Sequence, residues 1–245
     1  MRIVYIVHQF YPEFASGTER VTLGLARAAQ RAGHHVQVLA CVLDRAGSPG
    51  RPSTALAGAL EHTVDGVPVM LVDRSGLPAL AETSLEADAS QVEAIAAWMR
   101  AQRFEVAHVM HTMRNAASVM AARRAGLPLV LTLTDYFLGC LRVNLIDLDG
   151  QVCDGPGEGR TCARRCPTPV WGEDATMARY RQARSLLDAA AVCVAPSADV
   201  ARRFTAMFPG LRCRVIGHGV DLLMLGQAAA EAAAQGRSTP AAAGD

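Results

Sequence analysis

The first forty residues alternate between apolar runs and a glycine-containing loop, a pattern that few folds accommodate. Residues 3–7 (IVYIV) are apolar and largely β-branched, which is typical of a parallel strand buried on both faces. A loop over residues 8–19 follows, and residues 21–29 then carry apolar side chains at helical spacing, with Gly33 where the helix should stop. Residues 35–40 form a second apolar run. Together these segments predict a βαβ unit, whose crossover is right-handed in nearly all known cases.

The loop after the first predicted strand has features of a phosphate-binding turn. Gly17 lies at its end, and Thr18 is placed to cap the following helix. Backbone N–H groups at such a turn can hold a phosphate together with the helix dipole. The loop has only one glycine, so the three-glycine dinucleotide-binding pattern is not met. A tight turn without a ligand is therefore the alternative.

The rest of the chain repeats this alternation of strand and helix. Residues 41–60 are rich in Gly, Pro, Ser and Ala and predict a loop, and an Asp65-Gly66 turn predicts a hairpin across residues 61–72. Further strands are predicted at residues 106–110, 127–133, 192–195 and 213–216, and helices at residues 85–103, 115–125, 175–190 and 197–207. This order predicts a doubly wound parallel sheet with helices on both faces. An Ala-rich tail, partly disordered, is expected over residues 222–245.

Composition narrows the class of protein. The 24 basic and 23 acidic side chains give a formal charge of +1, which offers no electrostatic reason to bind nucleic acid. No apolar run approaches the roughly 18 residues needed to cross a bilayer, and no cleavable signal precedes the first strand. We therefore expect a cytoplasmic protein, in which the seven cysteines are free thiols or metal ligands rather than disulfides.

Four loops are the candidates for a binding site. In doubly wound sheets, ligands lie at the carboxyl ends of the strands, where the connections diverge. The loops at those ends are residues 8–18, 111–114, 134–136 and 218–221. We expect them to converge on one crevice lined by His8, His111 and His218, although a structural role is an equally good explanation for any single histidine.

These loops resemble the N-terminal domain of family 4 glycosyltransferases of the GT-B type. The resemblance is carried, in chain order, by residues 8–12 (HQFYP) with 16–21 (SGTERV), 32–36 (AGHHV), 131–136 (LTLTDY), 195–197 (APS) and 217–221 (GHGVD). It implies a Rossmann-like acceptor-binding domain over residues 1–221, facing a second domain that binds a nucleotide sugar. The chain ends about two dozen residues after the last motif. We therefore expect the donor domain to be absent and the chain to be inactive alone.

The resemblance also implies roles for individual residues in a retaining sugar transfer. Asp135 would orient an acceptor hydroxyl or act as a base, with capping of its own turn as the structural alternative. Thr134 replaces a histidine that the family places near the reacting sugar, and Ser16 replaces the first of two paired glycines near the donor diphosphate. The predicted substrate-binding residues are His8, Ser16, Gly17, Thr18, His111, Arg114, Thr134, Tyr136 and His218.

A cysteine-rich loop over residues 135–170 is the other distinctive segment. It is too rich in Gly, Asp and Pro to form much helix or sheet, and it contains Cys140, Cys153, Cys162 and Cys166. Four thiolates around a structural zinc ion would hold such a loop. An iron–sulfur cluster uses the same ligands, and cysteines that are packed or disulfide-linked without metal are the third alternative. Some family 4 members carry a similar insert.

Positive charge on this loop suggests an anionic partner. Two other functions are alternatives to sugar transfer. The arginines of the loop, which could meet an anionic acceptor or a lipid headgroup or simply form a solvated face, are Arg142, Arg160, Arg164 and Arg165. A non-catalytic module that binds a carbohydrate or a protein partner is favoured by Thr134 and by the expected loss of the donor domain. A Rossmann-like cofactor enzyme is disfavoured, because the glycine pattern and an acidic residue ending the second strand are both absent.

Overall fold

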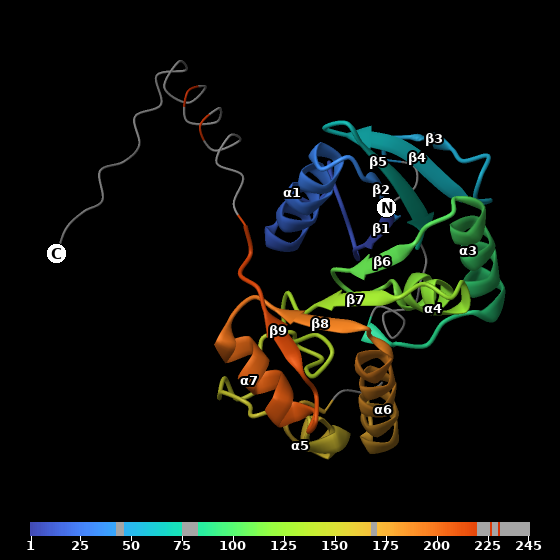
Figure 1. Ribbon diagram of the computed structural model, residues 1–245. Coiled ribbons are helices and arrows are strands. Elements are labelled where there is room, and N and C mark those ends of the chain that lie inside the picture. The colour runs from blue at the N-terminus through green and yellow to red at the C-terminus, as the bar shows by residue number, and fades with distance from the viewer. Residues whose placement is uncertain (43–46, 75–82, 168–170, 220–225, 227–229, 231–245) are drawn as a thin grey trace.

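The computed structural model describes residues 1–42, 47–74, 83–167 and 171–219, together with residues 226 and 230. Within this part of the chain, nine strands form one sheet in the order β3-β4-β5-β2-β1-β6-β7-β8-β9 (Figure 1). The strands are β1 (Arg2–Ile6), β2 (His35–Val42), β3 (Arg51–Pro52), β4 (Ala59–Val64), β5 (Val67–Asp73), β6 (Val106–Val109), β7 (Leu129–Thr132), β8 (Val192–Ala195) and β9 (Cys213–Val215). The helices are α1 (Gly17–Arg31), α3 (Ala89–Ala101), α4 (Ala116–Arg124), the 3-10 turn η1 (Gly157–Gly159), α5 (Arg160–Arg165), α6 (Glu173–Ala189) and α7 (Ala198–Met207).

The predicted βαβ unit forms the centre of the sheet. Strand β1 pairs in parallel with β2 on one side and with β6 on the other, and its apolar run is buried because both faces of the strand are covered. Gly33 ends the α1 segment with a φ of 81°, as expected. The predicted cap was wrong. Ser16, and not Thr18, is the N-cap of α1, because its N–H donates to the Glu19 carboxylate in a capping box.

The predicted parallel, doubly wound sheet is confirmed, with an antiparallel edge added to it. In sheet order, every pairing from β5 to β9 is parallel. At the β5 edge, β4 pairs antiparallel with β5, and β3 pairs antiparallel with β4. The prediction of a loop over residues 41–60 was too broad. Strand β2 continues to Val42, and the Asp65-Gly66 hairpin extends its first strand back to Ala59. Pairing across the sheet lengthened these strands beyond what local composition predicts.

Helices cover both faces of the sheet and bury two separate cores. Helix α1 packs Leu23 and Ala26 against one face of β1, β2 and β5. On the other face, side chains from α3, α4, α6 and α7 form the larger core, in which Trp98 and Phe204 are buried. None of the helices in the described ranges is long and apolar enough to cross a membrane. The predicted tail over residues 222–245 lies outside the described residues except for positions 226 and 230.

Candidate functional site

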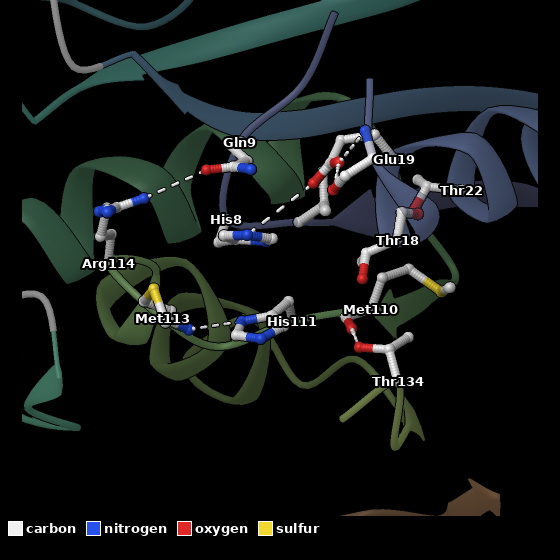
Figure 2. Close-up of polar contacts among 12 residues, drawn as sticks. His8, Gln9, Thr18, Glu19, Thr22, Met110, His111, Met113, Arg114 and Thr134 are labelled. Atoms are coloured by element: carbon white, nitrogen blue, oxygen red, sulfur yellow. Dashed lines mark hydrogen bonds and ion pairs between the residues drawn. The ribbon is translucent and has the colours of Figure 1, made fainter. Parts of the chain in front are cut away.

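The connections of the sheet diverge between β1 and β6, and three of the predicted site residues meet there. The chain leaves β1 toward α1 and β2 on one side and leaves β6 toward α4 and β7 on the other. His8 follows β1, His111 follows β6, and Asp135 follows β7. The imidazole rings of His8 and His111 lie 4.1 Å apart between centroids (Figure 2). The structure thus brings together three predicted loops at the carboxyl edge of the sheet.

His111 and Asp135 form a tightly defined pair. His111 Nε2 lies 2.7 Å from Asp135 Oδ2, and its Nδ1 accepts a hydrogen bond of 3.1 Å from the Met113 N–H. Since Nδ1 is occupied as an acceptor, Nε2 carries the proton and donates to the carboxylate. The other carboxylate oxygen, Oδ1, accepts from the Phe137 N–H at 2.8 Å. The His111 side chain is 3% exposed and that of Asp135 33%, so the carboxylate is the member of the pair that meets solvent.

His8 is a neutral, largely enclosed histidine beside a buried carboxylate. Its Nε2 lies 3.8 Å from Oε1 of Glu19, which is fully buried (Figure 2). Burial, together with the neighbouring His111 and the positive charge of Arg114, lowers the pKa of His8 to about 2. Neither His8 Nδ1 nor Glu19 Oε1 has a hydrogen-bond partner in the described structure. Buried polar atoms without a hydrogen-bond partner are uncommon in folded proteins.

Arg114 follows β6 and contacts β2, since its carbonyl accepts a hydrogen bond from the Cys41 thiol. It adopts a φ of 58°, a left-handed conformation that is uncommon for a residue other than glycine. Its carbonyl accepts a hydrogen bond from the Arg74 guanidinium, and its own guanidinium donates to Gln9 Oε1 at 3.3 Å (Figure 2). A strained backbone held by hydrogen bonds at a strand end is a common feature of functional sites.

The residues of the predicted glycine turn lie at the start of α1. Adding a Cβ to Gly17 would meet nothing within 4 Å, so the space beside the turn is open. Ser16 and Thr18 flank this glycine, and the Thr18 carbonyl accepts from Thr22 within the helix. Across the site, the Thr134 hydroxyl donates to the Met110 carbonyl at 3.0 Å (Figure 2). The Thr134 hydroxyl proton is thus engaged in a hydrogen bond within the protein, and the lone pairs of its oxygen can accept a hydrogen bond from a ligand.

Two predicted site residues have other surroundings. The Tyr136 ring stacks on Phe204 of α7, 5.9 Å between centroids, and packs against the larger core. His218 follows β9 and is exposed. These surroundings give Tyr136 a packing role, and in the described residues no hydrogen bond, ion pair or ring contact joins His218 to His111 or Asp135.

The cysteine-rich loop follows β7 directly after Asp135. All seven cysteines, including Cys140, Cys153, Cys162 and Cys166, are free thiols. In the described part of the chain, no group of three or more His, Cys, Asp or Glu side chains is arranged to hold a metal ion. The four cysteines nevertheless lie near one another, because burial raises the pKa of Cys162 to about 11 and the neighbouring Cys140, Cys153 and Cys166 raise it further.

Packing and hydrogen bonds hold the loop. The Asp147 carboxylate is buried, accepts from the Gln151 N–H and pairs with Arg165 at 2.5 Å. Gly159, with a φ of 102°, lies so close to helix α6 that a Cβ would come within 2.5 Å of the Met177 backbone. The loop also forms the short helix α5, which the prediction missed. A long loop needs internal contacts to remain compact, and these supply them.

Sequence reasoning missed two buried charged residues beside the site. Glu19 sits within a family motif but was not singled out, although a Ser-x-x-Glu spacing before an apolar run is the signal of a capping box. Arg179 of α6 is 5% exposed and donates to backbone carbonyls of the loop after Asp135. No local pattern distinguishes Arg179 from the surface arginines of a helix.

Comparisons with known proteins agree on one family and one fold. Residues 15–222 match the family described as Glycosyltransferase Family 4. A comparison with curated proteins finds no match. Among solved structures, sucrose-phosphate synthase from Thermosynechococcus elongatus is similar with a TM-score of 0.55 and 16% identity. Anabaena HepE in complex with UDP and glucose, at 14% identity, and an α,α-trehalose-phosphate synthase (UDP-forming) from Burkholderia vietnamiensis, at 11%, are each similar with a TM-score of 0.50.

The similarity covers most of this chain and about half of each solved structure. The aligned share of this chain is 91%, 91% and 98% for the three proteins in the order above. The aligned share of those proteins is 49%, 46% and 52%. At these identities, the likeness shows a shared fold.

Proposed function

Because the chain belongs to glycosyltransferase family 4, as its motifs predict, we propose that it forms the acceptor-binding part of an enzyme that transfers a sugar from a nucleotide sugar. The observation that carries this proposal is the pair formed by His111 and Asp135 at the divergence of the sheet. This pair presents a carboxylate to solvent while the protein holds both of its oxygens. An acceptor hydroxyl needs such a fixed hydrogen-bond acceptor to be aimed at the reacting carbon.

In this proposal, Asp135 contacts the acceptor and His111 positions Asp135. The imidazole cannot act as the base in the arrangement described, since Nδ1 accepts from a backbone N–H and Nε2 donates to the carboxylate. Asp135 first accepts a hydrogen bond from the acceptor hydroxyl. As the new glycosidic bond forms and the bond between the sugar and the nucleoside diphosphate breaks, the hydroxyl proton passes to the Asp135 carboxylate. Thr134, His8 and Arg114 would contact substrate around it. The resemblance favours retention of configuration at the transferred carbon.

The donor is proposed to be a nucleoside diphosphate sugar bound mainly by a second domain. Two of the similar proteins involve UDP, since HepE is in complex with UDP and glucose and the trehalose-phosphate synthase is UDP-forming. The open space beside Gly17 would let the donor phosphates approach the start of α1. Since this chain corresponds to about half of each solved structure, we propose that it does not turn over without a donor-binding domain.

Three finer proposals rest on sequence. The first is a structural zinc ion or iron–sulfur cluster, which the spacing of the four cysteines and their mutual proximity support, and elemental analysis of the purified protein tests it directly. A peripheral contact of the loop with an anionic surface is the second, although Arg160 and Arg165 are already engaged in ion pairs with carboxylates. The third is a cytoplasmic location, which fractionation of cells tests.

Titration of the chain with sugars tests the acceptor role. Saturation-transfer NMR with a panel of mono- and disaccharides should detect binding by the wild-type chain, and Asp135→Ala should weaken it at least tenfold. Asp149→Ala removes an exposed carboxylate from the cysteine-rich loop and serves as the matched control. By full-length protein we mean this chain joined to its proposed donor-binding domain. Sugar binding combined with no transfer by the full-length protein would favour the non-catalytic carbohydrate-binding module. Binding that is indifferent to Asp135 would refute the site.

A further inference from the structure

Arg179 is a buried cation that the proposed chemistry does not use. Its guanidinium sits on α6 and donates to the carbonyls of Thr83 at 2.9 Å, Leu138 at 3.3 Å and Phe137 at 2.5 Å. Its Cζ also lies 4.7 Å from the centre of the Phe137 ring. The Arg179 side chain thereby connects α6 to Thr83, which precedes α3 in the chain, and to the loop that follows β7. A planar fork of donors is required for three carbonyls, which an ammonium group cannot span.

Both oxygens of the Asp135 carboxylate are held by groups that Arg179 contacts or orders. The first route runs through the backbone, because the Phe137 carbonyl accepts from Arg179 and the Phe137 N–H donates to Asp135 Oδ1. The second route runs through side chains. The Phe137 ring, under the guanidinium, packs 5.1 Å from the His111 ring, which donates to Asp135 Oδ2. The two routes leave from one residue and end on one carboxylate.

Burying a guanidinium for packing alone is unfavourable. A buried charge loses its hydration, and an apolar side chain of similar volume at such a position is often neutral or stabilising. Burial lowers the pKa of Arg179 to about 10, which still leaves it charged at neutral pH. The buried guanidinium is therefore less favourable for stability than an apolar side chain would be. Its hydrogen bonds, however, fix the geometry of the loop that carries Asp135.

We propose that Arg179 is a positioning residue for sugar transfer, which sets the orientation of the Asp135 carboxylate through Phe137 and His111. This inference rests on the proposed function for its kinetic consequences, but its structural core stands apart from activity. Arg179 does not touch the substrate. It determines whether Asp135 presents its free lone pairs toward the crevice, and a misplacement of about 1 Å there costs on the order of 100-fold in rate.

The first test is spectroscopic and needs no substrate. In ¹⁵N-labelled wild-type protein, long-range ¹H–¹⁵N spectra should show His111 with a protonated Nε2 and a bare Nδ1. Arg179→Met should shift or broaden both His111 signals by releasing Phe137. Arg184→Met is the matched control, since Arg184 lies on the same helix and binds Asp188 and the Pro209 carbonyl at the surface. It should leave the His111 signals in place.

The second test is kinetic and uses the full-length protein. Arg179→Met should lower kcat about tenfold to 100-fold while changing the KM for the nucleotide sugar less than twofold. Arg179→Lys keeps the positive charge but loses the planar fork of donors. Its kcat should therefore lie between that of wild type and that of Arg179→Met. If Arg179→Met does not fold, the lysine variant carries both measurements.

The outcomes separate the two proposals. Unchanged His111 signals in a folded Arg179 variant would refute the positioning role, whatever the activity. Shifted signals in a protein that transfers no sugar with any donor would leave the positioning contact intact and overturn the proposed function. A kcat loss equal to that of Arg184→Met would mean that Arg179 acts on stability alone.

Discussion

Replacing Asp135 by asparagine is an almost isosteric change that the structure predicts to be costly. Each carboxylate oxygen accepts from a donor whose direction is fixed, namely His111 Nε2–H and the Phe137 N–H. An asparagine has one acceptor and one NH₂ group, so in either orientation its NH₂ group faces an N–H donor. His111 cannot relieve the clash by changing tautomer, because its Nδ1 accepts from the Met113 N–H.

The size of the effect follows from these contacts. A hydrogen bond to a charged group contributes about 1.5–3 kcal/mol, and an unpaired buried donor costs about 1–3 kcal/mol. Water relieves part of this, since the Asp135 side chain is 33% exposed. We expect Asp135→Asn to reduce the free energy of unfolding by about 2–3 kcal/mol, which lowers Tm by roughly 5–10 °C for a chain of this size.

Urea unfolding followed by circular dichroism measures this change. Asp149→Asn is the control, because it removes the same charge from an exposed side chain and should stay within about 0.5 kcal/mol of wild type. An Asp135→Asn variant that also stays within about 0.5 kcal/mol would contradict the assignment of His111 as a fixed donor. The positioning role proposed for His111 would then fail with it.

Two further predictions concern the pH and the backbone. Burial lowers the pKa of His8 to about 2 and that of His108 to about 4, so below pH 6.5 the unfolded chain binds protons that the folded chain excludes. Stability is therefore full above pH 6.5 and falls below it, by about 2 kcal/mol per histidine between pH 7 and pH 5. Urea unfolding at both pH values checks this, and His8→Gln should reduce the difference. Gly159→Ala forces a Cβ against the Met177 backbone and should cost about 3 kcal/mol, whereas Gly33→Ala shares the positive φ without the clash and should cost about 1 kcal/mol. Equal losses of stability in thermal unfolding of the two glycine variants would contradict the close approach of the loop to α6.

The sheet was predictable because the local sequence of its central strands is enough to identify them. Parallel strands buried on both faces read as continuous apolar runs, and residues 192–195 match β8 without any shift. Strand β3 could not be found in this way, since its two residues, Arg51 and Pro52, become a strand only by pairing with β4. Helix α5 was hidden in a similar manner within a glycine-rich loop.

The site was predictable as far as topology determines it. The rule that ligands bind where parallel strands end selected His8, His111 and Asp135, and the structure places their side chains in contact as a series. Arg179 could not be found, because its partners at positions 83, 137 and 138 are 41 to 96 residues away in the chain. The spacing of the cysteines, likewise, does not by itself determine the distances between thiols across a folded loop.

Sugar transfer by the full-length protein tests the central claim most directly. The protein should be incubated with a panel of nucleotide sugars and candidate acceptors, with release of nucleoside diphosphate and the glycosylated product measured together. The account predicts release with at least one nucleotide sugar and a loss of about 100-fold or more in Asp135→Ala. Absence of release with every donor, or full activity in Asp135→Ala, would contradict it.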